Sequence, residues 1–389
     1  MEPGACKVPD RDRPPHWGTM TNRSRFLRAS LLTLAALTGT APAAAPATSV
    51  TLIFDPAGPW DKAVNESAGG GLERAVREHG MPYDTVTSAD QNDMLSRARA
   101  AARSGSTLVI GVGRASAGAL SKAAGEFPKV RFVGVDALPG GANTVGLRFR
   151  EQEGGFLAGF LAANVTSTRV LGVITGAEDA TARKYRAGFE AGVTLACPDC
   201  RVLRASLPRG GNMVGAASLA RGQYARGADI ILAAVGAGNR GVVTAATAVQ
   251  CLRASRLPAG VRFHADPYRN VPRSDPYRAE CHGNTRPVFA IATESSLDAP
   301  GDTDVDRKTL NHTLTSVLKR ADNAVFTLVD EVAKGRPWRA GDRTFGVENG
   351  GIELSMGDFN AALVPPALRA KLTKVQRMIV NGVVKVPVQ

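Results

Sequence analysis

Sequence motifs that mark many enzymes are missing from this chain of 389 residues. It has no Gly-x-Ser-x-Gly sequence for a hydrolase nucleophile and no Gly-x-x-x-x-Gly-Lys-Ser/Thr loop for nucleotide phosphates. Its histidines are few and never stand at metal-ligand spacing; they are His16, His79, His264, His282 and His312. We therefore expect no enzyme, no cofactor and no metal site. A hydrolase, which would turn over its bound ligand, is the weakest of the hypotheses.

Aromatic residues and long apolar runs are also scarce. Aromatic side chains make up 5% of the chain, so the core is predicted to consist mainly of Ala, Val and Leu. No apolar run reaches the length that spans a bilayer. The formal net charge is +13, but Lys and Arg are spread along the chain without a basic run interleaved with aromatics. This pattern favours a solvated basic surface, and we expect no nucleic-acid partner.

The N-terminal segment has the pattern of an export signal. Arg23, Arg25 and Arg28 lead into a short apolar run over residues 29–37, and residues 41–47 offer small-residue cleavage sites. We predict that residues 1–47 are a leader and signal peptide and that the mature chain is exported to the periplasm or cell envelope. No cysteine stands at the cleavage region, so lipid anchoring through an N-terminal cysteine is not expected. Met1 and Met20 are both candidate starts.

Four of the five cysteines are predicted to form disulfides. Cys6 lies in the leader, Cys197 and Cys200 form a Cys-x-x-Cys sequence, and Cys251 and Cys281 enclose a segment of unusual composition. Export implies an oxidising compartment, which favours one bridge within each of these two pairs. The Cys-x-x-Cys pair is also compatible with a redox pair or half a zinc site, but it follows a helical stretch and has no second copy.

Strands and helices are predicted to alternate along the rest of the chain. The predicted strands are apolar runs at 51–54, 83–87, 106–111, 130–136, 144–149, 170–175, 202–207, 230–235 and 288–292, with helical stretches between them. This order indicates an α/β protein with doubly wound parallel sheets, and it restarts near Val170 as a second lobe. Residues 253–286 break the rhythm because they are rich in Arg and Pro and contain Asp-Pro-Tyr-Arg twice. We predict a surface excursion there, with a lid or docking loop as the alternative.

Polar residues stand where the predicted strands end. In open parallel sheets, ligands bind outside the carboxyl ends of the strands. We therefore predict that these residues line a ligand cleft: Asp55, Asp136, Gly236 and Glu294 at strand ends, and Trp60, Asp61 and Asn65 after the first strand. Each is also explicable as a cap or turn residue, for example Asp61 as a helix N-cap with Trp60 packed against that helix.

Several segments resemble one family of binding proteins. Asp61-Lys-Ala-Val-Asn-Glu-Ser67 is similar to the family pattern Asp-Lys-Ser-Phe-Asn-Gln-Ser, and further similar segments follow in order at 143–159, 185–193, 227–231, 315–322 and 364–372. The chain thus resembles the basic membrane protein family, also called PnrA-like, of ABC transporter substrate-binding proteins. The resemblance implies a type I periplasmic-binding-protein-like fold, with two lobes joined by three crossings around a ligand cleft. It also implies purine nucleoside binding without catalysis, and an ABC permease in the membrane as partner; we expect a monomer.

The resemblance extends to domains and individual residues. We predict that residues 48–150 and about 308–340 form lobe I, and that residues 151–307 and about 341–389 form lobe II, with 253–286 inserted. The positions that resemble the polar ligand contacts of the family are Asp55, Asp136, Gly236 and Lys319, and Asn65 keeps the motif asparagine.

Four positions depart from the family pattern. The two aromatic stackers fall on Val64 and Leu207, an asparagine falls on Pro56, and an aspartate that holds ribose hydroxyls falls on Ala292. A stacked base is worth about 1–3 kcal/mol in nucleic-acid sites, so these departures bear on the specificity for nucleosides. We hypothesise that Trp60 supplies a substitute ring.

The sequence therefore predicts an extracytoplasmic solute-binding protein of an ABC importer, which closes two lobes on a small polar ligand such as a purine nucleoside. One alternative is a binder of another, sugar-like solute. The other is an envelope interaction protein with a degenerate cleft, which would use the 253–286 segment and the basic surface.

Overall fold

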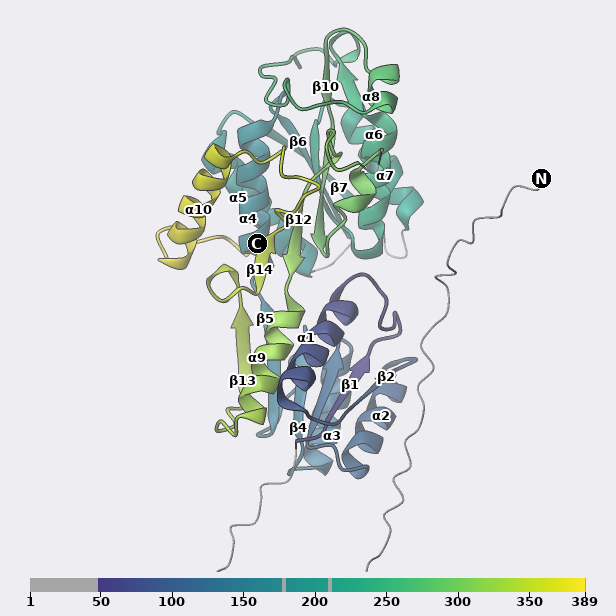
Figure 1. Cartoon of the computed structure of the whole chain (residues 1–389), viewed down its shortest axis with the longest axis vertical. Coiled ribbons are helices and arrows are strands. Elements are labelled where there is room, and N and C mark those ends of the chain that lie inside the picture. Colours follow the sequence, from purple (N-terminus) through teal and green to yellow (C-terminus); the bar gives the residue numbers. More distant parts are fainter. Residues whose placement is uncertain (1–47, 177–179, 209–211, 305, 389) are drawn as a thin grey trace, which may run out of the picture. The chain divides into compact units, whose positions relative to one another are not determined.

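The structure is a computed structural model that describes residues 48–176, 180–208, 212–304 and 306–388. The strands in these ranges form two six-stranded sheets and one two-stranded sheet (Figure 1). The leader predicted for residues 1–47 lies outside the described residues.

The first sheet, which defines lobe I, is parallel throughout and has the strand order β13-β5-β4-β3-β1-β2. Its strands are β1 (Val50–Phe54), β2 (Tyr83–Thr87), β3 (Leu108–Val112), β4 (Arg131–Val135), β5 (Thr144–Phe149) and β13 (Gly341–Phe345). Helices α1 (Val64–His79) and α9 (Ala321–Ala333) pack on one face, and α2 (Gln91–Arg103) and α3 (Ser116–Glu126) on the other. The central strands are buried because helices cover both faces.

The second sheet, which defines lobe II, has the order β14-β12-β11-β8-β6-β7 and is parallel except for β14. Its strands are β6 (Val170–Gly176), β7 (Arg201–Leu207), β8 (Ile230–Ala234), β11 (Phe289–Glu294), β12 (Thr313–Lys319) and β14 (Ile352–Leu354). Helices α4 (Glu151–Val165) and α5 (Ala180–Ala196) share one apolar cluster with the sheet, and α6 (Met213–Ala225) and α7 (Asn239–Val249) share another. Helix α10 (Pro366–Val380) packs against α4.

Both sheets reverse their winding at a defined pair of strands. β1 lies between β2 and β3, and β6 lies between β7 and β8, so the chain winds in one direction from β1 or β6 and in the other direction afterwards. The carboxyl ends of strands at such a reversal are where open α/β sheets bind ligands. The doubly wound α/β fold predicted from the sequence is confirmed, and it directs attention to the residues after β1, β4, β8 and β11.

The chain passes between the two sheets three times: from β5 to α4, from β12 to α9 and from β13 to β14. The predicted domain boundaries near 308 and 341 are each wrong by one strand. β12 pairs with β11 in lobe II, and β13 pairs with β5 in lobe I. The local sequence could not show this, because each strand's sheet is decided by a partner far away in the chain.

The predicted surface excursion at 253–286 is in part a core segment. The structure has a short antiparallel strand pair, β9 (Cys251–Arg253) with β10 (Thr285–Pro287), and between these strands the short helix α8 (Asp275–Glu280). The two copies of Asp-Pro-Tyr-Arg each place a buried tyrosine: Tyr268 packs on Phe289 of β11, and Tyr277 stacks on the buried His312. The proline of α8 stands in its first turn, where no backbone N–H is needed. Both predicted disulfides are present, Cys197–Cys200 and Cys251–Cys281.

Helices α4 and α5 lie side by side (Figure 1). Glycines line the contact between them. A Cβ atom at Gly159 would overlap the backbone carbonyl of Phe189, and one at Gly188 would overlap that of Gln152. Only glycine permits this approach of two backbones. The close packing brings the start of α5 beside the start of α4, where the charged residues of the candidate site lie.

Candidate ligand cleft

Asp55, which follows β1, is held in place by Asn65 of α1. Nδ2 of Asn65 donates to Oδ1 of Asp55 at 2.7 Å, and the backbone N–H of Asp55 donates to Oδ1 of Asn65 at 3.3 Å. Asn65 is fully buried, and the backbone N–H of Ala57 also donates to Oδ1 of Asp55, at 2.9 Å. A Cβ atom at Gly113, after β3, would stand 3.1 Å from the other carboxylate oxygen. Asp55 therefore presents an oriented carboxylate at the winding reversal of lobe I.

Asp61 and Trp60 lie in the loop before α1 and have different surroundings. Oδ1 of Asp61 accepts from the backbone N–H groups of Ala63 and Glu66 at 2.8 and 3.1 Å, and Oδ2 accepts from that of Asn65 at 3.1 Å. The N-cap residue of α1 is Ala63 and not Asp61, as the alternative interpretation had it, but the Asp61 carboxylate still satisfies N–H groups at the start of this helix. Trp60, in contrast, is 77% exposed and does not pack against the helix.

Lys319, the last residue of β12, lies among three carboxylates. Its Nζ is 2.7 Å from Oδ2 of Asp136, 3.2 Å from Oε1 of Glu151 and 3.6 Å from Oε1 of Glu294. The Lys319 side chain is only 2% exposed. Burial alone would lower the pKa of Lys319, but the three carboxylates outweigh it and raise that pKa well above its ordinary value. Lys319 is therefore a permanently charged ammonium at this site.

The three carboxylates come from different parts of the fold. Asp136 follows β4 of lobe I, Glu294 ends β11 of lobe II, and Glu151 begins α4 between the lobes. Asp136 and Glu294 both have left-handed backbone conformations, with φ of 59° and 72°. Such conformations are uncommon for residues other than glycine and cost on the order of 1–3 kcal/mol, so they concentrate at functional sites.

Two further residues complete this buried cluster. Nζ of Lys184, on α5, is 2.8 Å from Oε2 of Glu151, whose side chain is 1% exposed. The hydroxyl of Tyr185 is buried and has no hydrogen-bond partner within the described ranges. Burial raises the pKa of Tyr185, and Lys319, Glu294, Glu151 and Asp136 all act on it electrostatically. Tyr185 is thus an uncharged polar group beside the charged cluster.

Gly236 lies on the lobe II side of the site. It follows β8 with φ of 56° and begins a short 3-10 turn (Gly236–Gly238) that leads into α7. Asn239, the first residue of α7, fixes this turn: its Nδ2 donates to the carbonyl of Thr293 at 3.1 Å, and its Oδ1 accepts from the N–H of Val235 at 2.9 Å. The backbone N–H groups at a helix start are suited to polar or anionic ligand groups.

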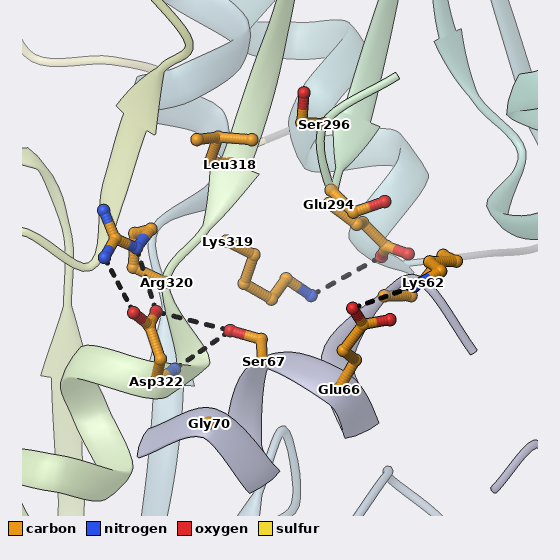
Figure 2. A pocket seen from close by; sticks show the side chains of 12 residues that line it. Lys62, Glu66, Ser67, Gly70, Glu294, Ser296, Leu318, Lys319, Arg320 and Asp322 are labelled. Carbon is orange, nitrogen blue, oxygen red and sulfur yellow. Dashed lines mark hydrogen bonds and ion pairs between the residues drawn. The ribbon is translucent and has the colours of Figure 1, made fainter. Parts of the chain in front are cut away.

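Two adjoining cavities lie where these elements meet, and they share Lys62, Ala63, Glu294 and Ser295. The larger, about 460 Å³, is also lined by Lys319 and by residues of α1 and α9 (Figure 2). Figure 2 shows the ammonium of Lys319 directed toward Glu294, and Ser67 of α1 bonded to Asp322 of α9. The smaller cavity, about 320 Å³, is also lined by Asp61, Gly236 and Arg240. Both lobes thus contribute walls to one cleft.

Of the predicted residues, Asp61, Gly236, Glu294 and Lys319 line the two cavities, whereas Asp55, Trp60, Asn65 and Asp136 are not among the lining residues. Asp55 contacts Asn65, Lys319 contacts Asp136 and Glu294, and Asp61 and Gly236 line the cavity that Glu294 shares. Glu151, Lys184 and Tyr185 belong to the same cluster but were not among the site residues predicted from the sequence. Glu151 stands in the Glu-Gln-Glu-Gly-Gly-Phe segment directly after β5. Its position after a strand end, where the chain leaves lobe I, could have identified it as a site residue.

Three of the four positions that depart from the family pattern, Val64, Leu207 and Ala292, carry small or aliphatic side chains, and the structure shows where each of them lies. Leu207, at the end of β7, is 5% exposed and packs among residues of α6 and the turn before α7. Ala292 is fully buried in β11, and Glu294, two residues later on the same strand face, reaches the cleft. Val64 is the first residue of α1.

Among the residues that the structure describes, two groups of side chains have ligating atoms close enough for a metal ion, but neither group lines the cleft. One comprises Glu78, His79 and Asp330, the other Asp302, Asp304 and Asp306. His79 is bonded to Asp330 at 2.8 Å, and the three aspartates accept hydrogen bonds from their own loop. These partners account for both groups. In the part of the chain that the structure describes, no helix has the length and apolar character needed to cross a membrane.

Comparison with known proteins points to one family. The family model described as ABC transporter substrate-binding protein PnrA-like matches residues 48–250, more than half of the chain. A "CD4+ T-cell-stimulating antigen" of Listeria innocua is 26% identical over 87% of this chain and 88% of its own length. The "ABC transporter nucleoside-binding protein BmpA" of Lactococcus lactis subsp. cremoris is 24% identical over 86% of this chain and 88% of its own.

A solved structure agrees on the fold. The solute-binding protein of an ABC transporter system from Aeropyrum pernix K1 has a TM-score of 0.65 and 20% identity, covering 87% of this chain and 94% of that one. The sequence match, the two doubly wound lobes and the cleft between them agree with one another. This chain belongs to the PnrA-like family of ABC transporter substrate-binding proteins, which bind solutes and are not enzymes.

Proposed function

We propose that this protein is the extracytoplasmic solute-binding component of an ABC importer, and that it holds a purine nucleoside or a closely similar polar solute in the cleft. The observation that carries the proposal is the Lys319 cluster, in which carboxylates from both lobes meet one buried ammonium at the carboxyl ends of the strands. The nucleoside-binding name of the Lactococcus lactis relative supports this choice of ligand.

The chemistry of the cleft suits a ligand with several hydroxyl and N–H groups. Carboxylates such as Asp55, Asp136 and Glu294 accept hydrogen bonds from sugar hydroxyls and from base N–H groups, while Lys319 and the start of α7 donate. Since Asp136 and Glu294 belong to different lobes, a ligand between them would favour the closed arrangement of the lobes by bonding to both.

A sugar-like solute without an aromatic base is the second candidate. The observation that favours it is the aliphatic character of the two stacking positions, since Leu207 is buried in the lobe core and Val64 carries no ring. Trp60 is the aromatic side chain that could compensate, because it stands in the loop that borders the smaller cavity and is largely exposed.

The remaining parts of the proposal concern location and partners. We place the mature protein in the periplasm or cell envelope, because the signal-like pattern of residues 23–47 accords with the family's role. The partner would be an ABC permease that accepts the ligand from the closed lobes, with the binding protein acting as a monomer.

The test is a thermal-shift screen of residues 48–389 against purine nucleosides, pyrimidine nucleosides and common sugars. A ligand at 100 times its Kd stabilises the native state by about 2.7 kcal/mol, which is easily detected. We expect a shift with inosine, guanosine or adenosine, and its loss in the variant Asp136→Asn. A shift with a sugar but with no nucleoside would select the second candidate, and no shift with any of these compounds would contradict both.

A further inference from the structure

A third cavity, of about 400 Å³, lies at the opposite end of the lobe II sheet from the cleft. Its walls come from the amino ends of β6 and β7 and from the segment after β9: residues 168–170, Asp199, Arg201, 259–261 and His264. The parallel strands β6 and β7 have their carboxyl ends at the cleft and their amino ends here. This pocket is therefore separate from the ligand site.

The turn that carries Arg169 is fixed by a buried carboxylate. Oδ1 of Asp229 accepts from the hydroxyl of Thr166 at 2.8 Å, and Oδ2 accepts from the backbone N–H groups of Ser167 and, at 3.1 Å, Thr168. The N–H of Arg169 donates to Oγ1 of Thr166 at 3.0 Å, and Arg169 itself has φ of 59°. A non-glycine residue in this conformation costs on the order of 1–3 kcal/mol, so the surrounding hydrogen bonds hold the backbone of this turn in place.

The other two walls are anchored to the same turn. The backbone N–H of Arg201 donates to the carbonyl of Arg169 at 2.9 Å, and the Cys197–Cys200 disulfide directly precedes Arg201. The N–H of His264 donates to the carbonyl of Ser167 at 2.7 Å. The two arginines thus leave adjacent strand ends, and the His264 segment faces them from the 253–286 region.

The charge of the pocket is positive. Within the described ranges, the guanidinium groups of Arg169 and Arg201 have no ion-pair or hydrogen-bond partner, and neither has that of Arg262 nearby. Asp199 is the carboxylate among the lining residues. Desolvation first, and then the charges of Arg169 and Arg262, lower the pKa of His264, so its imidazole is neutral near pH 7 and can donate one hydrogen bond.

We propose that this pocket is a binding site for a phosphate group. Two guanidinium groups on adjacent strand ends are suited to the oxygens of a phosphate, because arginine donates in a planar fork that matches them. A cavity of about 400 Å³ has room for the phosphate and part of the molecule that carries it. A soluble phosphate ester and the headgroup of an anionic lipid share this chemistry, and the experiment separates them.

The experiment measures binding of inorganic phosphate by isothermal titration at low and at physiological salt, using residues 48–389. The test variant is Arg169→Gln with Arg201→Gln. The matched control is Arg336→Gln with Arg339→Gln, which removes the same charge from exposed arginines that line a pocket of lobe I. We expect the Kd for phosphate to rise about tenfold in the test variant, because hydrogen bonds to charged groups are lost. In the control variant the Kd should stay within about twofold of the wild-type value.

A second variant keeps the arginines. Ala259→Glu adds a carboxylate to the lining at an exposed position and should weaken phosphate binding without disturbing the turn at Arg169. Flotation with phosphatidylglycerol vesicles, against phosphatidylcholine vesicles, identifies the source. Binding to phosphatidylglycerol that the test variant loses indicates a lipid headgroup, whereas binding of phosphate alone indicates a soluble ester. Absence of phosphate binding, or equal losses in the test and control variants, would overturn the proposal.

Discussion

Nζ of Lys319 lies 2.7 Å from Oδ2 of Asp136, and this ion pair joins the last residue of β12 in lobe II to the residue after β4 in lobe I. The two residues are 183 positions apart in the chain. The pair lies at the cleft, with Glu151 and Glu294 also close to Lys319. The same ion pair therefore connects the two lobes and forms part of the candidate ligand site.

The variant Lys319→Met tests the contribution of the ammonium to the fold. Removing one partner of a buried ion pair leaves uncompensated carboxylates and costs about 3–5 kcal/mol, so we expect a loss of that size in the free energy of unfolding. Urea denaturation measures it. The control is Lys62→Met, which breaks the exposed pair with Glu66 at 3.1 Å and should cost less than about 0.5 kcal/mol. Equal losses in the two variants would show that the Lys319 cluster does not stabilise the fold.

The variant Asn65→Leu tests whether Asp55 acts as an oriented ligand group. It removes the two hydrogen bonds between Asn65 and Asp55, leaving the carboxylate with the bond from the N–H of Ala57, and it keeps a similar volume in a fully buried place; the cost should be about 1–3 kcal/mol of stability. We also expect the affinity for the ligand found in the solute screen to fall, because the carboxylate is held by fewer hydrogen bonds. Thermal unfolding and titration calorimetry measure the two effects. A less stable protein with unchanged affinity would show that Asp55 is structural only.

The variant Trp60→Ala separates a ligand role from a structural one. Because the side chain is 77% exposed, the stability should change by no more than about 0.5 kcal/mol. If the indole stacks on the ligand, the affinity should fall by about tenfold or more, in line with about 1–3 kcal/mol per stacked ring. Trp60 and Trp338 are the tryptophans of residues 48–389, so in the variant Trp338→Phe the fluorescence reports on Trp60. An unchanged Kd, with unchanged iodide quenching on ligand addition, would refute the stacking role.

The buried side chain of His312 should make the stability of the fold depend on pH. Burial lowers its pKa to about 4, while its Nδ1 hydrogen bond to the carbonyl of Val288, 2.8 Å long, opposes the shift in part. The unfolded chain binds the proton near pH 6.5, before the folded chain does, so His312 costs no stability above that pH and lowers the stability as the pH falls toward 4.

The variant His312→Gln isolates this effect from the other groups that titrate. Between pH 6.5 and 4, the wild-type chain should lose about 1.4 kcal/mol per pH unit relative to the variant. Asp229 acts in the opposite direction, since burial raises its pKa to about 6, but it is present in both proteins and cancels in the difference. Urea denaturation across this pH range measures the slope, and parallel curves would mean that His312 is protonated in the folded state.

Much of the site could be anticipated because its residues follow strands. The alternation of apolar strands and amphipathic helices is a local property, so it predicted two doubly wound lobes and marked Asp55, Asp136, Gly236 and Glu294 as strand-end residues. The predictions for Cys197–Cys200 and Cys251–Cys281 were confirmed as well, since an export signal and four cysteines outside the leader already favour two disulfides.

Contacts across long stretches of chain were decided by the tertiary structure. The type of each helix or strand and the family of the chain could be derived from the sequence, because both depend on short runs of residues. Only the packed fold decided that β12 lies in lobe II and β13 in lobe I, that Tyr268 and Tyr277 enter the core, and that Glu151 and Asp136 meet Lys319. Burial and ion pairing depend on which surfaces come into contact after the chain has crossed between the sheets. Local sequence patterns do not predict those contacts.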